Sequence, residues 1–211
     1  AAATSALPGA TNNAAVPGTG ESRDQSLAKS ARVTIDTPAL SGSINLTGAR
    51  FDDLKLKDYH ETVDDKSPII TLLSPAETKD GYFTELGYVG NEATGAAPGP
   101  QTVWTLKDGN QLTQSTPVTL TYTNEKGVTF DRTISVDEHY MFQVNDKITN
   151  GSAEPVALSG YGRVTRFSKP ATPSVYVLHE GFIGVLGDHG LQEVKYAKVE
   201  NDAPVEPGKA T

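Results

Sequence analysis

Apolar and polar residues alternate along much of the second half of the chain. Every second position is apolar in residues 118–122, and the same period returns in residues 128–136. Successive side chains of a strand point to opposite faces of a sheet, so this period predicts strands with one buried face. The polar, glycine-containing segments 124–127 and 150–152 predict turns between such strands. We therefore expect an antiparallel meander in this part of the chain.

Two details of the meander concern charged residues. Arg132 is the exception on the otherwise apolar face of the strand predicted at 128–136. The ionisable run Asp137–His139 follows that strand, and its polar character predicts a further turn. Tyr140 is then expected to start the next strand, which continues through Phe142.

The first half contains shorter alternating runs at residues 33–37 and 44–46, and the apolar run 68–73 has the length of a strand. Gly90–Pro100 is rich in glycine, alanine and proline, which predicts a long, exposed and flexible loop. The chain has no long segment of helical period and no internal repeat. These patterns predict an all-β fold, an antiparallel sandwich or barrel with little helix.

The two ends of the chain differ from its middle. Residues 1–31 are rich in alanine, threonine, proline and glycine and almost lack large apolar side chains. Such a segment buries too little apolar surface to offset the entropy of ordering it, so we expect a disordered linker. Residues 201–211 have a similar composition and are expected to form a flexible tail. The predicted folded domain is residues 32–200.

Charge and composition exclude several classes of protein. The 211 residues include 26 Asp and Glu against 18 Lys and Arg, a formal net charge of −8. This balance argues against nucleic acid as a partner and against docking on anionic lipid through charge. The absence of cysteine excludes a disulfide framework, a thiol nucleophile and a cysteine-based zinc site. No apolar run approaches the roughly 20 residues that span a bilayer, so we expect the chain itself to be soluble.

The densest ionisable cluster is Asp137–Tyr140, which could form an acid–base site. Catalysis requires groups that converge on one point, but neighbouring residues of a strand point to opposite faces. A solvated turn explains the cluster better, so we predict no catalytic residue here.

No motif indicates a metal or cofactor. The four histidines are His60, His139, His179 and His189. They are scattered along the chain, and no two of them have the spacing of metal ligands. The glycine-rich segments 159–162 (SGYG) and 187–190 (GDHG) do not lie between a strand and a helix, as a phosphate-binding loop must. We predict that both are bulges or turns. Trp104 has apolar neighbours, which favours partial burial over an exposed binding platform.

The order of these features resembles the large periplasmic domain of the bacterial inner-membrane insertases of the YidC/Oxa/Alb family. The resemblance runs through VTIDTPALSGSINLTGARFDDLKLKDYHE, PIITLLSP and PVTLTYTNEKGVTFDRTISVDEHYMFQVNDKITNGSAEPVALSGYGRV. The shared features are a glycine-bearing turn, an apolar pair with a following tyrosine, a hairpin, a strand and an N…P…G segment. The turn corresponds to Ser41–Ser43, and the apolar pair with its tyrosine to Leu54, Leu56 and Tyr59. The hairpin, the strand and the N…P…G segment correspond to Thr121–Phe130, Tyr140–Asn150 and Asn150–Gly160. The resemblance covers about Arg32 to Glu200.

The resemblance implies a twisted β-supersandwich similar to galactose mutarotases, facing the periplasm of a Gram-negative bacterium. It implies a non-enzymatic role in the insertion and folding of membrane proteins, and contact with the SecD/SecF complex of the Sec translocon. The insertase machinery itself would lie in a membrane part that this chain lacks. Residues 1–31 would link a preceding transmembrane helix to the domain. The family's domain usually ends in a helical segment, whereas here residues 194–200 run into NDAPVEPGKAT without a visible helix.

For partner contact the resemblance directs attention to residues 179–198, with apolar side chains at the centre and polar ones around them. The candidate partner-binding residues are Glu180, Phe182, Ile183, Leu186, Glu193 and Lys195. The alternative is that these are core residues of strands.

Two other functions remain open. A mutarotase-like enzyme or sugar-binding module on the same fold would need a carboxylate and a histidine facing each other across a cleft. A structural spacer would need no specific partner at all.

Overall fold

A computed structural model describes residues 20–169, 178–185, 188 and 190–201. Its contacts divide the chain into two compact units, residues 1–168 and 169–211. The first unit contains a short helix, α1 (Arg23–Leu27), and eleven strands. In chain order these are β1 (Arg32–Asp36), β2 (Leu40–Asn45), β3 (Arg50–His60), β4 (Ile69–Leu73), β5 (Tyr82–Gly90), β6 (Thr105–Asp108), β7 (Gln111–Leu112), β8 (Val118–Thr123), β9 (Val128–Val136), β10 (Phe142–Asn150) and β11 (Leu158–Arg166). The second unit contains β12 (Gly181–Val185), β13 (Leu191–Lys195) and α2 (Tyr196–Asn201).

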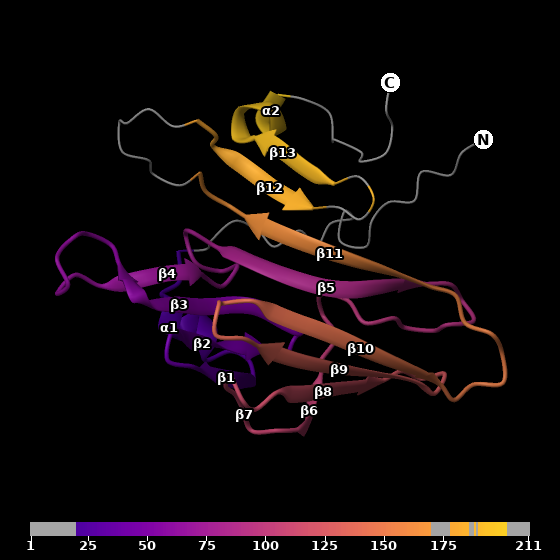
Figure 1. Cartoon of the computed structure of the whole chain (residues 1–211). Coiled ribbons are helices and arrows are strands. Elements are labelled where there is room, and N and C mark those ends of the chain that lie inside the picture. Colours follow the sequence, from indigo (N-terminus) through magenta and orange to yellow (C-terminus); the bar gives the residue numbers. More distant parts are fainter. Residues whose placement is uncertain (1–19, 170–177, 186–187, 189, 202–211) are drawn as a thin grey trace. The chain divides into compact units, whose positions relative to one another are not determined.

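The first unit is a sandwich of two sheets. The larger sheet has the strand order β11-β5-β3-β2-β1-β7, with β4 paired to β3, and the smaller has the order β10-β9-β8-β6 (Figure 1). Every pairing is antiparallel except β1 with β7. Buried apolar side chains from both sheets form one core, for example Ile35 and Ile44 from the larger and Leu120 and Phe130 from the smaller. The predicted all-β, mostly antiparallel sandwich is thus confirmed.

The predicted meander corresponds to β8, β9 and β10. Burial alternates without interruption along β9, where every second residue from Val128 to Val136 is buried. Arg132 belongs to this buried face and is 1% exposed, so the exception in the pattern is a buried arginine. The pairing of β9 with β10 aligns Phe142 with Val136 and Asn150 with Val128.

The turn between β9 and β10 includes Tyr140, so the prediction that Tyr140 starts a strand was wrong. Tyr140 has a φ of 69° and the strand begins at Phe142. Asp137 explains the longer turn, because its Oδ1 accepts hydrogen bonds from the backbone N–H groups of His139 and Met141, both at 2.8 Å. The Asp137 carboxylate thus accepts two backbone hydrogen bonds within the turn. The alternation of apolar and polar residues gives no sign of these bonds.

Two other local predictions differ from the structure. Ser41–Ser43 is not a turn but part of β2, and a Cβ on Gly42 would lie 2.1 Å from the carbonyl oxygen of Asp53 on the paired strand. The SGYG segment lies inside the regular strand β11 and forms neither a bulge nor a turn. The alternation of apolar and polar residues shows only which face each side chain occupies. It does not show where two backbones approach so closely that only glycine fits.

The loop predicted at Gly90–Pro100 is anchored rather than free. Thr94 is fully buried, and its hydroxyl donates to the carbonyl oxygen of Ala157 at 2.9 Å. The side-chain amide of Asn124 donates to the carbonyl oxygen of Thr94 at 2.6 Å. These partners are distant in sequence, which is why composition alone suggested an exposed excursion.

Local order also begins before the predicted domain boundary at Arg32. Ser22 and Gln25 form a capping box at the start of α1, in which each side chain bonds the other residue's backbone N–H. Arg23 forms an ion pair with Asp53 and donates to the carbonyl oxygen of Leu73 at 2.9 Å. Residues 1–19 of the predicted linker and the predicted tail from residue 202 lie outside the described residues.

The second unit is a β-hairpin followed by a short helix. β12 pairs with β13 from Gly181 opposite Lys195 to Val185 opposite Leu191. The helix α2 corrects the expectation that residues 194–200 show no helix. Its length of six residues explains why no helical period was visible. None of the helices described here is long and apolar enough to cross a membrane.

Candidate functional site

A groove in the first unit runs between β5 of the larger sheet and β10 of the smaller sheet. It consists of two adjoining hollows, of about 350 and about 290 Å³, which share Leu86 of β5 and Val144 of β10 as lining residues. One hollow is lined mainly by polar groups and glycines, and the other by apolar side chains. We call them the polar end and the apolar end of the groove.

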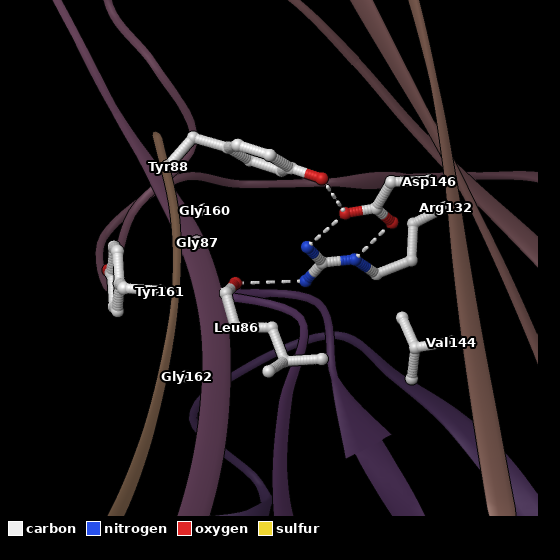
Figure 2. Close-up of a pocket in the computed structure, with 9 residues that line it drawn as sticks. All are labelled: Leu86, Gly87, Tyr88, Arg132, Val144, Asp146, Gly160, Tyr161 and Gly162. Atoms are coloured by element: carbon white, nitrogen blue, oxygen red, sulfur yellow. Dashed lines mark hydrogen bonds and ion pairs between the residues drawn. The ribbon is translucent and has the colours of Figure 1, made fainter. Parts of the chain in front are cut away.

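The polar end is built around Arg132 and Asp146. The guanidinium of Arg132 donates to both carboxylate oxygens of Asp146, at 2.8 and 2.7 Å, and to the carbonyl oxygen of Leu86 at 2.9 Å (Figure 2). It also lies over the ring of Trp104, 4.9 Å from the ring centroid. The predicted burial of Trp104 is confirmed, since this side chain is 1% exposed. The two opposite charges cancel, so the polar end offers hydrogen bonds but no net charge.

Tyr88 completes this network. Its hydroxyl donates to Asp146 at 2.7 Å (Figure 2). Burial, and then the hydrogen bond to the Asp146 carboxylate, raise the pKa of Tyr88 to about 12. Tyr88 is therefore protonated at neutral pH and acts as a donor. A general acid or base at neutral pH works best with a pKa near 7, and the pKa of Tyr88 lies far above that value.

Glycines form the floor of the polar end. Gly160 and Gly162 of β11 lie opposite Tyr88 and Leu86 of β5. A Cβ built on Gly160 would lie 3.6 Å from the ring of Tyr88, an ordinary contact, and one built on Gly162 would lie 3.1 Å from the Leu86 side chain, a tighter one. Tyr161 between them points away from the network in Figure 2. The SGYG segment therefore lines the groove, which its glycine-rich composition alone did not reveal.

The apolar end brings together four elements. Its lining consists of Phe51, Leu54, Leu72, Leu73, Thr84, Leu86, Tyr140, Phe142 and Val144. Phe51 of β3 contacts Phe142 of β10 edge to face, with ring centroids 5.3 Å apart. Tyr140 donates a hydrogen bond to Asp58 at 2.8 Å, and this bond is the main reason that its pKa rises to about 12. The Phe51–Phe142 contact joins the two sheets on one side of the groove. The hollow of the apolar end reaches Leu86 of β5 and Val144 of β10.

The Asp137–Tyr140 cluster does not converge on a site. The side chains of Glu138 and His139 are 77% and 81% exposed, and Asp137 is engaged with the turn backbone. Among the described residues, no group of three or more histidine, aspartate or glutamate side chains is arranged to hold a metal ion. The groove lining contains no histidine among the residues described, so it lacks the carboxylate–imidazole pair that a mutarotase-like reaction requires.

Four of the candidate partner-binding residues lie on the β12–β13 hairpin of the second unit, on two different faces: Phe182, Ile183, Glu193 and Lys195. Ile183 is 61% exposed and lies opposite Glu193, which is also exposed, and Lys195 shares this face. Phe182 lies on the other face and packs edge-on against Tyr196, with ring centroids 5.3 Å apart. The two residues named together as an apolar surface are thus separated, because neighbours on a strand point to opposite faces.

Two exposed residues that the sequence reasoning missed extend the Ile183 face. Val185 and Leu191 are 72% and 62% exposed and lie opposite each other across the hairpin. We call Ile183, Val185 and Leu191 the hairpin face. Glu180 is half-buried, its carbonyl oxygen accepts a hydrogen bond from the N–H of Tyr196, and Leu186 lies outside the described residues. Period-2 counting from Ile183 would have found Val185.

Comparison with known proteins identifies relatives across nearly the whole chain. The model of the "YidC periplasmic domain" family matches residues 32–211. A membrane protein insertase YidC of Rhizobium meliloti is 73% identical over 206 residues, which are 98% of this chain and 34% of the relative. The corresponding proteins of Sinorhizobium fredii and Brucella melitensis are 75% and 58% identical over 191 and 203 residues, covering 90% and 92% of this chain and 32% and 33% of theirs. The chain spans about a third of the length of these curated relatives.

Proposed function

This chain belongs to the YidC periplasmic domain family, and we propose that it supports the insertion and folding of inner-membrane proteins from the periplasmic side. The match of the family model to residues 32–211 is the observation that carries the proposal. In this role the domain is attached to a membrane-embedded insertase and handles membrane-protein clients without catalysing a reaction. A membrane protein insertase is the description of each of the relatives named above.

We further propose that the hairpin face is the contact site for the SecD/SecF accessory proteins of the Sec translocon. The support is its composition, since Ile183, Val185 and Leu191 are exposed apolar residues next to the charged Glu193 and Lys195. An apolar centre with a polar rim is typical of protein interfaces. Glu180 and Leu186 remain proposed members of the surface, and Phe182 acts indirectly by packing the hairpin on Tyr196.

Co-purification from membranes tests this contact. Full-length insertase carrying Ile183→Asp is expected to recover far less SecD/SecF than the wild type, because a carboxylate would be desolvated at the centre of the interface. Val63→Asp is the matched control, since Val63 is fully exposed in the first unit and should have no effect. Equal recovery of SecD/SecF with both variants would exclude the hairpin face.

The broader role has a separate test. The test uses a strain whose insertase is supplied by a plasmid. In this strain, deletion of residues 32–200 from the insertase is expected to impair membrane-protein insertion or Sec-dependent growth. Unchanged insertion and growth would instead support a structural spacer.

A further inference from the structure

Three charged side chains form a row across the larger sheet, on the face opposite to the groove. Phe51 of β3 is paired with Thr84 of β5, and both residues line the apolar end of the groove. Their neighbours Arg50 and Glu85 point away from the groove, because successive side chains of a strand alternate between the two faces. Arg163 of β11 is paired with Glu85 and shares its face. We call Arg50, Glu85 and Arg163 the Arg–Glu–Arg row.

Glu85 is the buried centre of the row. It is 1% exposed, and its Oε1 lies 2.7 Å from Nη2 of Arg163 while its Oε2 lies 3.4 Å from Nε of Arg50. Neither contact has the geometry of a hydrogen bond, so both carboxylate oxygens and the Nε atoms of both arginines are buried without one. Among the residues that the structure describes, neither guanidinium donates a hydrogen bond. The row is held by charge alone, and its donors remain available.

The row also carries one positive charge more than its carboxylate neutralises. Arg32 of β1 shows a complete pairing for comparison, since it forms a hydrogen-bonded ion pair with Asp52. Arg50 and Arg163, in contrast, share the single carboxylate of Glu85. A cation in a mostly buried position is stabilised by an anion that also accepts its hydrogen bonds. The described part of the chain supplies only half of the anions that this row requires.

An anion from outside can reach the two arginines. The side chain of Arg163 is 30% exposed and that of Arg50 is 10% exposed. Of the nitrogens in this row, those buried without a hydrogen bond are the two Nε atoms, so the terminal nitrogens keep contact with solvent. Arg50 is held in place by Phe83, because its guanidinium carbon lies 4.8 Å from the centroid of that ring. The donors are thus fixed before a ligand arrives, which lowers the entropy lost on binding.

The arrangement of the row selects the class of anion. β5 lies between β11 and β3 in the larger sheet, so the two arginines approach Glu85 from opposite sides (Figure 1). A carboxylate presents two oxygens along one edge and matches a single guanidinium. A phosphate group has oxygens directed tetrahedrally and can accept from two guanidinium groups on different sides, and arginine is well suited to this contact. A singly charged phosphate also balances the extra positive charge of the row.

We propose that Arg50 and Arg163 bind a phosphate group, either free or on a lipid headgroup, above Glu85 on the face of the larger sheet opposite to the groove. The terminal N–H groups of both arginines donate to the phosphate oxygens, and the carboxylate of Glu85 holds the two guanidinium groups from below. This inference goes beyond the proposed function. It concerns neither the groove nor the hairpin face, so each of these proposals can fail alone.

Titration of the 211-residue chain with inorganic phosphate tests the site. The ionic strength is kept constant, the pH is mildly acidic so that phosphate is mainly singly charged, and binding is followed by NMR of the arginine Nε–H groups. We expect saturable shifts of the Arg50 and Arg163 signals. Arg163→Gln should weaken binding at least fivefold, because it removes the extra charge and one set of donors. The absence of a saturable shift in the wild type would overturn the proposal.

Arg166→Gln is the matched control for this titration. Arg166 lies on the same strand, is also half-buried, and donates to the backbone carbonyl of Ser168 at 2.9 Å instead of pairing with Glu85. Its variant should therefore bind phosphate as the wild type does. Equal affinities of Arg163→Gln and Arg166→Gln would show that phosphate binds elsewhere, which also overturns the proposal.

Glu85→Gln separates anion binding from a purely structural role of the row. The substitution removes the negative charge beneath the phosphate, so the affinity should rise at least fivefold over that of the wild type. Phosphate should then raise the thermal midpoint of this variant more than that of the wild type, because a ligand that binds the folded state stabilises it. A destabilised variant without a gain in affinity or in midpoint would contradict the proposal. If Glu85→Gln does not fold, the comparison of Arg163→Gln with Arg166→Gln decides.

Two further probes identify the source of the phosphate group. Co-sedimentation compares vesicles of phosphatidylglycerol with vesicles of a glycolipid that lacks phosphate. Binding to phosphatidylglycerol alone, abolished by Arg163→Gln, would support the proposal with a lipid headgroup as the ligand. Saturable phosphate binding without co-sedimentation would support it with free phosphate as the ligand. Acetate that binds as tightly as phosphate would overturn the assignment to a phosphate group.

Discussion

The groove and the hairpin face are both surfaces with apolar residues, but they are constructed differently. The groove is lined by residues held through buried contacts, such as the Arg132–Asp146 pair and the Phe51–Phe142 contact between the sheets. The hairpin face consists of side chains that are more than half exposed. Substitutions at the groove should therefore change stability as well as binding, whereas substitutions on the hairpin face should change association alone.

The largest effect is expected from Arg132→Met. It leaves the Asp146 carboxylate, whose side chain is only 11% exposed, without its cation. Breaking a buried ion pair in this way costs about 3–5 kcal/mol of unfolding free energy. Urea denaturation followed by circular dichroism measures it. Arg166→Met is the control, because Arg166 is half-buried, lies over Tyr82 and donates to the backbone carbonyl of Ser168, so about 1 kcal/mol is expected. Equal losses in both variants would contradict a special role for the Arg132 network.

A smaller effect is expected from Tyr88→Phe at alkaline pH. The pKa of Tyr88 is about 12 in the folded chain, against an ordinary value of 10.0 for tyrosine. Because the folded pKa is raised, the contribution to stability is present below pH 10 and is lost as the pH rises from 10 toward 12. The wild type should therefore lose more stability between pH 9 and 11 than Tyr88→Phe does. Denaturation curves at both pH values measure the difference, and parallel losses would show that Tyr88 titrates normally.

The smallest effect on stability is expected from Leu191→Ser on the hairpin face. Leu191 is 62% exposed, so the change in unfolding free energy should stay within about 0.5 kcal/mol. Thermal denaturation of the chain checks this value, and SecD/SecF recovery with the full-length variant should fall as for Ile183→Asp. A loss of 2 kcal/mol or more would indicate that Leu191 is buried in the folded chain and would remove the hairpin face as a binding surface.

The sequence predicted the fold more reliably than the candidate sites. Alternation in residues 118–122 and 128–136 is a direct consequence of one buried sheet face, and β8 and β9 occupy these segments. The groove was not predicted, because its residues come from β3, β4, β5, β9, β10 and β11 and meet only when the two sheets pack. One available signal was Arg132, since a charged residue on a buried face requires a partner.

The sequence by itself determined which residues alternate, where most turns fall and, through its resemblance, the family to which the chain belongs. These are local or linear properties, and they are set by side-chain polarity and spacing. Only the tertiary structure decided that Asp146 neutralises Arg132, that Gly160 and Gly162 form a floor, and that β10 ends its sheet at a groove. Such features depend on distances between segments far apart in the chain, and no period along the sequence records them.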